Sequence, residues 1–415
     1  MNSTLTSPIA DDERCRTLAS PEADVDLETL LERAHAIGER AAGLAEQADR
    51  EHKLDDSIVE DMNRARLMQV LQPRRWGGLE MGFPAQVRIS QALAQHDVAT
   101  SWVYSILSIH HWWGAFTTPE MQAELWRADP HLLFSDVFAP TGKAEAVDGG
   151  YLLSGEWKFS SGVLWSKWVA LGVTLDDGGE PDYRMMFVPK SECEVLDDWD
   201  TLGMRGTGSC GVRVERRFIP EYRTLSLFPM IANGTGPGNA INPGPLYRLP
   251  FGPGICLSLM GCSVGGAQGM LGLMTERMKA RTPTFTVERQ HQMGHSQVVL
   301  AHNTVRVTAC EHLLYSYADE LSRVGETLVA GGEIDVMELR TRMFGWRAFM
   351  SAETRGAATA LFENAGASSI YADSTIQRFW RDIHSIAQHV VQNYEVGMSN
   401  YGRFLLGQEP LPSIY

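Results

Sequence analysis

The sequence is poor in cysteine and has no excess of basic residues. Its 415 residues include six cysteines, with no pair at zinc-ligand spacing and no short chain that would need disulfides: Cys15, Cys193, Cys210, Cys256, Cys262 and Cys310. We expect free, buried thiols. Lysine and arginine total 36 against 51 aspartate and glutamate, a formal net charge of −15, which excludes nucleic-acid binding through a general basic surface.

Long apolar runs are also lacking. No stretch offers the roughly 18 uninterrupted apolar residues of a membrane span, and the polar start "MNSTLTSPIADDERCRTLASPEADVD" has no signal-peptide core. We therefore expect a cytoplasmic protein that binds no membrane. No strand–GxGxxG–helix pattern predicts a nicotinamide site. A hydrophobic share of 44% is enough for a large core in two or three domains.

The residue composition and the spacing of apolar residues change along the chain. Residues 1–25 are expected to be a mobile tail, and "DLETLLERAHAIGERAAGLAEQADREHKL" opens a helical region over 26–130. Alternating apolar runs with turn residues between them predict a β domain at 131–228. A Gly/Pro-rich excursion follows at 229–254, and helical spacing returns over 255–415, including 374–405. The prediction is an α+β fold: an N-terminal helical domain, a β-barrel or sandwich, and a C-terminal four-helix bundle.

Six motifs occur in one order along the chain: "PRRWGG", "APTGKAE", "WKFSSG", "FVPK", "WDTLGMRGTGS" and "RFWRD". With this layout, they resemble the acyl-CoA dehydrogenase superfamily from about residue 27 to residue 410. The residues in these motifs are most similar to those of one branch, the oxygenase components of two-component flavin monooxygenases. Members of this branch act on 4-hydroxyphenylacetate, on a phenolic ring in steroid degradation, or on dibenzothiophene.

The resemblance implies a flavin bound between the β domain and the bundle, and a homotetramer. It further implies that a separate NAD(P)H:flavin reductase supplies the reduced flavin. Oxygen would convert this flavin to a C4a-hydroperoxide, which would hydroxylate a phenolic or other aromatic substrate.

The stretch "RFWRDIHSIAQHVVQNYEVG", residues 378–397, lacks the glutamate of a dehydrogenase. In acyl-CoA dehydrogenases that base lies in a Glu-Gly-Thr motif after an Arg-Asp pair. Here the corresponding position is Val390, beside His389, and no such motif exists. Glu395 comes five residues later, a turn of about 140° on a continuous helix, and we expect it at the surface. The same offset separates His384 from His389, so both cannot face one pocket.

His389 is therefore the predicted catalytic residue. The resemblance places a histidine here, facing flavin and substrate. An imidazole with a pKa of about 6.5 can accept a phenol proton near neutral pH. A histidine on a helix is more often a core residue, but the missing glutamate favours catalysis.

Two further motifs supply candidate catalytic groups. In "SWVYSILSIHHWWGAF" the resemblance implies that His110 contacts substrate or peroxide, with His111 as the fallback; the plainer interpretation is an aromatic core. In "WKFSSG" it implies that Ser161 hydrogen-bonds near the flavin N5, although serines at strand ends are often only turn formers.

The remaining predicted residues concern the cofactor. The resemblance implies that Trp199 lies against the flavin, and Arg205, Thr207 and Ser209 either contact the flavin or shape the rim of the β domain. It also nominates Ser135, Phe138 and Thr141 for the isoalloxazine edge.

In the superfamily, a segment with an arginine followed by a phenylalanine reaches the flavin phosphate of a neighbouring subunit. Arg281 and Phe285, in "ERMKARTPTF", match this segment if a two-residue insertion is allowed. This departure favours FMN and leaves FAD open. Alternatives are an N- or S-oxygenating monooxygenase, a desaturating acyl-CoA dehydrogenase, and a flavin carrier without catalysis.

Overall fold

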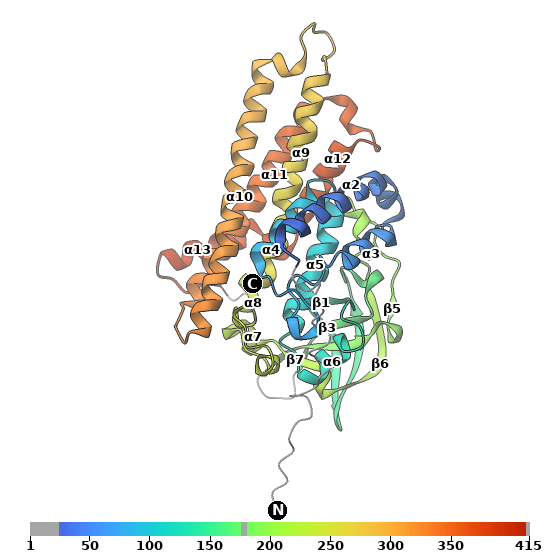
Figure 1. Ribbon diagram of the computed structural model, residues 1–415, viewed down its shortest axis with the longest axis vertical. Coiled ribbons are helices and arrows are strands. Elements are labelled where there is room, and N and C mark those ends of the chain that lie inside the picture. Colours follow the sequence, from blue (N-terminus) through green and yellow to red (C-terminus); the bar gives the residue numbers. More distant parts are fainter. Residues whose placement is uncertain (1–24, 176–180, 412–415) are drawn as a thin grey trace, which may run out of the picture.

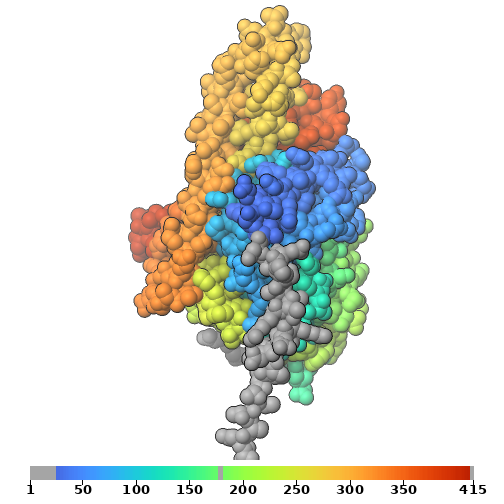
Figure 2. Space-filling view, viewed as in Figure 1, coloured from blue at the N-terminus to red at the C-terminus, as the bar shows by residue number. Residues whose placement is uncertain are grey.

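The computed structural model describes residues 25–175 and 181–411. The predicted tail therefore lies, except for its last residue, outside the described residues. The chain then forms a helical group that packs between the sheet and the long C-terminal helices (Figures 1 and 2). Its members are α2 (Leu27–Glu51), α3 (Asp56–Arg64), α4 (Phe83–Ala94), α5 (Val98–Gly114) and α6 (Pro119–Trp126).

Helix α5 is the centre of the molecule. Of its 17 residues only Ile106 is not fully buried, because α4, α9, β1 and the 205–207 turn all pack against it. A helix with large apolar side chains on every side must be covered on every side. Asp97 caps its N-terminus and accepts hydrogen bonds from the Thr100 amide and hydroxyl at 2.8 and 2.6 Å.

The β domain is one mixed seven-stranded sheet with the order β5-β6-β2-β1-β3-β4-β7. Strand β1 organises it: residues 134–137 pair in parallel with β3, and residues 143–147 pair antiparallel with β2. The register shifts between Val137 and Gly142, so the strand bends there. The strands are β1 (Phe134–Val147), β2 (Gly150–Trp157), β3 (Trp168–Leu175), β4 (Asp182–Pro189), β5 (Glu194–Val195), β6 (Val212–Pro220) and β7 (Thr224–Ser226).

The C-terminal helices form the predicted bundle. They are α8 (Phe251–Leu257), α9 (Met260–Ala280), α10 (Gly294–Val329), α11 (Val336–Ala365), α12 (Thr375–Ile386) and α13 (Tyr394–Leu405). The excursion before them holds α7 (Phe228–Asn233) and two short 3-10 turns. Residues 251–280 are long and apolar enough to cross a membrane, but 83% of their most apolar window is buried. Their apolar side chains therefore pack against other elements of the protein.

The predicted helix over 374–405 is wrong in its middle. Helix α12 ends at Ile386, and residues 390–392 form a separate 3-10 turn that His389 caps. The apolar spacing continues across the break, so the pattern alone did not show it. The rotation argument for Glu395 and His384 assumed a continuous helix and fails. Glu395 is nevertheless exposed, in the first turn of α13.

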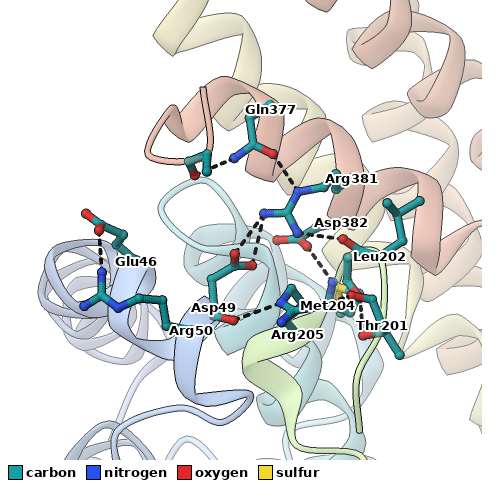
Figure 3. A network of polar contacts seen from close by, with 12 residues as sticks. Glu46, Asp49, Arg50, Thr201, Leu202, Met204, Arg205, Gln377, Arg381 and Asp382 are labelled. Carbon is teal, nitrogen blue, oxygen red and sulfur yellow. Dashed lines mark hydrogen bonds and ion pairs between the residues drawn. The ribbon is translucent and has the colours of Figure 1, made fainter. Parts of the chain in front are cut away.

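A polar network joins three distant segments (Figure 3). From α12, the Arg381 guanidinium donates to both Asp49 carboxylate oxygens on α2, at 3.1 and 3.0 Å, and to the Leu202 carbonyl at 2.6 Å. Its neighbour Asp382, which is buried, accepts a hydrogen bond from the Met204 amide at 2.6 Å. Arg205 donates to the Asp49 carbonyl at 3.0 Å. These contacts fix the 199–209 loop between α2 and α12.

Replacing Gly142 by alanine should destabilise the sheet. The added Cβ would lie 1.9 Å from Cζ2 of the fully buried Trp157. We expect the free energy of unfolding to fall by about 1–3 kcal/mol. Gly43→Ala is the matched control: it lies within α2 with nothing within 4 Å of the new Cβ, and should stabilise by about 0.5–1 kcal/mol. Chemical denaturation measures both; equal effects would contradict the packing described.

Asp382 should make stability depend on pH. Burial raises the pKa of Asp382 from 3.8 to about 7, and the Met204 hydrogen bond only partly opposes this. Between those values the folded chain binds a proton that the unfolded chain does not, so the free energy of unfolding from this group falls as pH rises. Asp382→Asn does not titrate. Its unfolding free energy relative to wild type should rise between about pH 4 and pH 7; a constant difference would refute the assignment.

Candidate functional site

One face of α5 points to the sheet. Trp102, Ile106, His110 and Trp113 recur at helical spacing, so their side chains lie on one side of the helix. Facing them on β1 are Phe134, Asp136 and Phe138, which alternate along the strand and therefore share a face.

Ser161 belongs to a chain of hydrogen bonds with one direction. The Thr207 hydroxyl donates to the Met204 carbonyl at 2.9 Å, so it accepts from Ser209 at 2.9 Å. Ser209 then accepts from Ser161 at 2.8 Å, and Ser161 accepts from the Trp102 indole N–H at 3.3 Å. Because the Ser161 proton is used, its half-buried oxygen offers the site a lone pair rather than a proton.

His389 lies at the other side of Trp102, with ring centroids 5.5 Å apart. Its Nδ1 accepts a long hydrogen bond from the Val391 amide at 3.4 Å, so the neutral ring carries its proton on Nε2. Burial lowers the pKa of His389 to about 4, against the opposing charge of Asp136. In this arrangement His389 presents an N–H donor.

His110 is enclosed. Its Nδ1 donates to the Phe134 carbonyl at 2.5 Å, and its Nε2 lies 3.1 Å from Oδ2 of Asp136. The Trp113 indole N–H donates to the same oxygen at 2.9 Å. Only 1% of the His110 side chain is exposed. Both ring nitrogens are thus occupied by protein groups, and His110 acts on its surroundings through Asp136.

The predicted flavin residues divide between two faces of β1. Phe138 packs on Trp113 and on Phe251, with ring centroids 5.6 and 5.2 Å apart, on the α5 side. Ser135 is buried on the opposite side and accepts from the Ser160 hydroxyl at 3.2 Å. Thr141 is exposed and donates to the Glu156 carbonyl at 2.8 Å.

Trp199 is half-buried, and its indole N–H donates to the Met204 carbonyl at 3.1 Å. The ring of Phe159 meets it edge-on at 6.0 Å. Phe159 is 69% exposed and holds a left-handed backbone with φ of 65°. A large apolar ring kept exposed in such a conformation, next to Ser160 and Ser161, fits a flat aromatic partner.

Arg281 and Phe285 lie elsewhere, at the end of the α9–α10 hairpin farthest from the sheet (Figure 1). Phe285 is fully exposed. Arg281 donates to the Ala365 carbonyl at 3.1 Å, and Arg277 donates to the same carbonyl and to Ser368. Burial and Arg281 lower the pKa of Arg277. Within the described ranges neither arginine has a carboxylate partner, so the pair fits a phosphate.

The other histidines are accounted for by structure. His111 is fully buried, with its two ring nitrogens on the Met68 and Leu132 carbonyls at 2.7 and 3.1 Å. His384 lies 3.0 Å from the Thr359 hydroxyl, beside a surface groove of about 550 Å³ between α11 and α12. Neither is brought next to His389.

Two residues of the site were not among those predicted. Trp102 contacts both Ser161 and His389, and Asp136 contacts His110. Asp136 carried a signal: it is the one charged residue in the apolar run "LLFSDVF". A carboxylate between buried residues of a strand needs a partner or a function.

Family models match both helical parts of the chain. The acyl-CoA dehydrogenase N-terminal domain matches residues 26–126, and its C-terminal domain matches residues 257–394.

Related proteins are similar in sequence along nearly the whole length of this chain. The flavin-dependent monooxygenase oxygenase subunit HsaA of Mycobacterium tuberculosis is 31% identical, over 86% of this chain and 90% of its own. The p-hydroxyphenylacetate 3-hydroxylase oxygenase component of Acinetobacter baumannii is 28% identical, over 94% and 92%. The crystal structure of HsaA superposes with a TM-score of 0.87 at 29% identity, over 94% of this chain and 100% of its own. The chain belongs to the acyl-CoA dehydrogenase family, in the branch of flavin-dependent monooxygenase oxygenase subunits.

Proposed function

We propose that the protein is the oxygenase component of a two-component monooxygenase that hydroxylates a phenolic or other aromatic compound. A separate NAD(P)H:flavin reductase would supply the reduced flavin, and the flavin would activate oxygen as its C4a-hydroperoxide. The observation that carries the proposal is the grouping of His389, Trp102 and Ser161 where a dehydrogenase would hold its glutamate base.

The names of relatives support this substrate class and the separate reductase. They are called oxygenase subunits or components, and include a p-hydroxyphenylacetate 3-hydroxylase and an FADH2-dependent resorcinol hydroxylase of Rhizobium. XiaF from Streptomyces, solved with FADH2, is 25% identical and superposes with a TM-score of 0.85, over 96% of this chain and 99% of its own.

Bound flavin would supply the oxygen activation, and the described side chains fit its ring. Trp199 and Phe159 offer aromatic surface. Ser161 offers a lone pair, which suits the N5–H of a reduced flavin. Arg381 and Asp382 hold the 199–209 loop, and this loop keeps Ser209 in hydrogen-bond contact with Ser161.

His389 would then interact with the reacting oxygen or with the substrate. The base function predicted from the sequence stays a prediction, and it needs a free lone pair on Nε2. With Nδ1 on the Val391 amide and a pKa near 4, the ring instead offers N–H to an oxygen atom. As a donor it would stabilise negative charge on the oxygen atom that is left on the flavin when the O–O bond breaks.

The arginines at the α9–α10 hairpin would serve the flavin phosphate of a neighbouring copy. Their distance from the sheet in Figure 1 is consistent with a site shared between copies, as in the predicted homotetramer. Apolar side chains left exposed around the hairpin are available for such packing: Phe285, Val287, Val298, Val305, Ile370 and Tyr371.

The direct test combines the protein with chemically reduced flavin, oxygen and a panel of phenols, without any reductase. A hydroxylated product found by mass spectrometry supports the proposal. In a parallel assay with oxidised flavin and an acyl-CoA, desaturation without any phenol hydroxylation in the first assay would replace it with the dehydrogenase alternative.

His389→Ala should uncouple the reaction. We expect the variant to bind reduced flavin as wild type does, because the flavin contacts proposed above come from other residues. Hydroxylation should fall by about 100-fold or more, the scale of losing one oxyanion donor, while oxygen is released as hydrogen peroxide.

The control is His384→Ala, which removes a histidine five positions earlier whose ring hydrogen-bonds Thr359 and the Trp380 carbonyl. The measurement is the ratio of hydroxylated product to peroxide. Wild-type coupling in His389→Ala would remove His389 from the mechanism.

The flavin preference predicted from the sequence can be measured by equilibrium titration under nitrogen. If the altered 281–285 segment gives no support to an adenine, FMNH2 should bind at least as tightly as FADH2, because only the shared phosphate is held. Tighter binding of FADH2 by about tenfold, a difference of about 1.4 kcal/mol, would overturn the preference for FMN.

A further inference from the structure

Asp136 is the carboxylate of the site, and only one of its two oxygens is engaged. The Trp113 indole N–H and His110 Nε2 both meet Oδ2, at 2.9 and 3.1 Å. Oδ1 has no hydrogen-bond partner within residues 25–175 and 181–411, and 13% of the side chain is exposed.

The protonation of the pair follows from its geometry. Nδ1 of His110 must carry a proton, because it faces the Phe134 carbonyl, which can only accept. A second proton must lie between Nε2 and Oδ2, whichever atom holds it. In either state Oδ1 keeps a lone pair that is free to accept. His110 and Trp113 therefore orient Asp136 as positioning residues, and stacking of His110 on Phe134, with centroids 5.3 Å apart, holds the assembly.

Aromatic side chains lie beside Asp136. Phe138, two residues along the same face of β1, packs between Trp113 and Phe251. His389 contacts Trp102, which lies on the same face of α5 as His110, the partner of Asp136, so the two groups border one face of this helix. One presents an acceptor and the other a donor, beside aromatic walls.

We propose that Oδ1 of Asp136 binds a hydrogen-bond donor on the aromatic substrate, an O–H or N–H on the ring. The inference rests on the proposed function and narrows its substrate class. The site then selects rings that carry a donor, and disfavours rings on which a methyl ether or a carboxylate takes the donor's place. A carboxylate would meet Oδ1 with two acceptors face to face and with like charge.

Three probes of one shape test the selection: 4-ethylphenol, its methyl ether and 4-ethylbenzoate. Binding to the flavin-free protein is measured by calorimetry, and hydroxylation with supplied reduced flavin is measured separately. Wild type should bind the phenol about 10- to 100-fold more tightly than either of the others, the range of a hydrogen bond to a charged group.

Asp136→Asn should change the sign of this preference. The Trp113 indole N–H can only donate, so we expect the amide oxygen to turn toward it and the amide NH2 to face the site as a donor. The variant should then bind the carboxylate or the ether at least as well as the phenol. Asp148→Asn, in the exposed turn between β1 and β2, is the matched control and should keep the wild-type order.

The outcomes separate the two proposals. A well-folded Asp136→Asn with the wild-type order of binding overturns the function of Asp136, and so does a wild type that binds phenol and ether equally, even if the variant does not fold. Phenol hydroxylation in either case leaves the monooxygenase proposal standing. The expected binding order without any hydroxylation would instead support Asp136 and refute the monooxygenase proposal.

Discussion

Every polar atom on helix α5 needs a partner from another element, because the helix is buried almost completely on all sides. That requirement organises the site. The Trp102 N–H reaches Ser161, the Trp113 N–H and His110 reach Asp136, and the nitrogens of His111 reach backbone carbonyls. The first two sets of contacts lie on the α5 face that meets the sheet. These hydrogen bonds therefore offset the cost of burying the polar groups of α5, and they also orient the groups that we propose to be functional.

The second constraint is the attachment of the 199–209 loop. Arg381 and Asp382, within α12, hold the loop against this helix, and the break after Ile386 then carries His389 toward Trp102. One helix thus fixes both the loop that supports Ser161 and the histidine opposite it. This explains why an Arg-Asp pair can persist where the dehydrogenase glutamate is absent: the pair serves the loop, whichever chemistry follows.

Much of this architecture could be predicted from the sequence. Apolar periodicity located the helices, alternation located the sheet, and the missing Glu-Gly-Thr motif singled out His389. The break between Ile386 and Tyr394 could not be found this way, because apolar spacing continues through it while tertiary contacts decide the backbone. The rotation argument for Glu395 therefore gave the right exposure for a wrong reason. Asp136 was passed over because its value depends on His110 and Trp113, which only the fold brings to it.

The central claim is that this chain transfers an oxygen atom from dioxygen to an aromatic ring. The most direct measurement supplies the protein with reduced flavin and a phenol under dioxygen labelled with oxygen-18, and weighs the product. The account predicts one labelled oxygen atom in the new hydroxyl group and none when the label is placed in water instead. A product labelled only from water, or consumption of dioxygen entirely as hydrogen peroxide with every phenol tried, would contradict it.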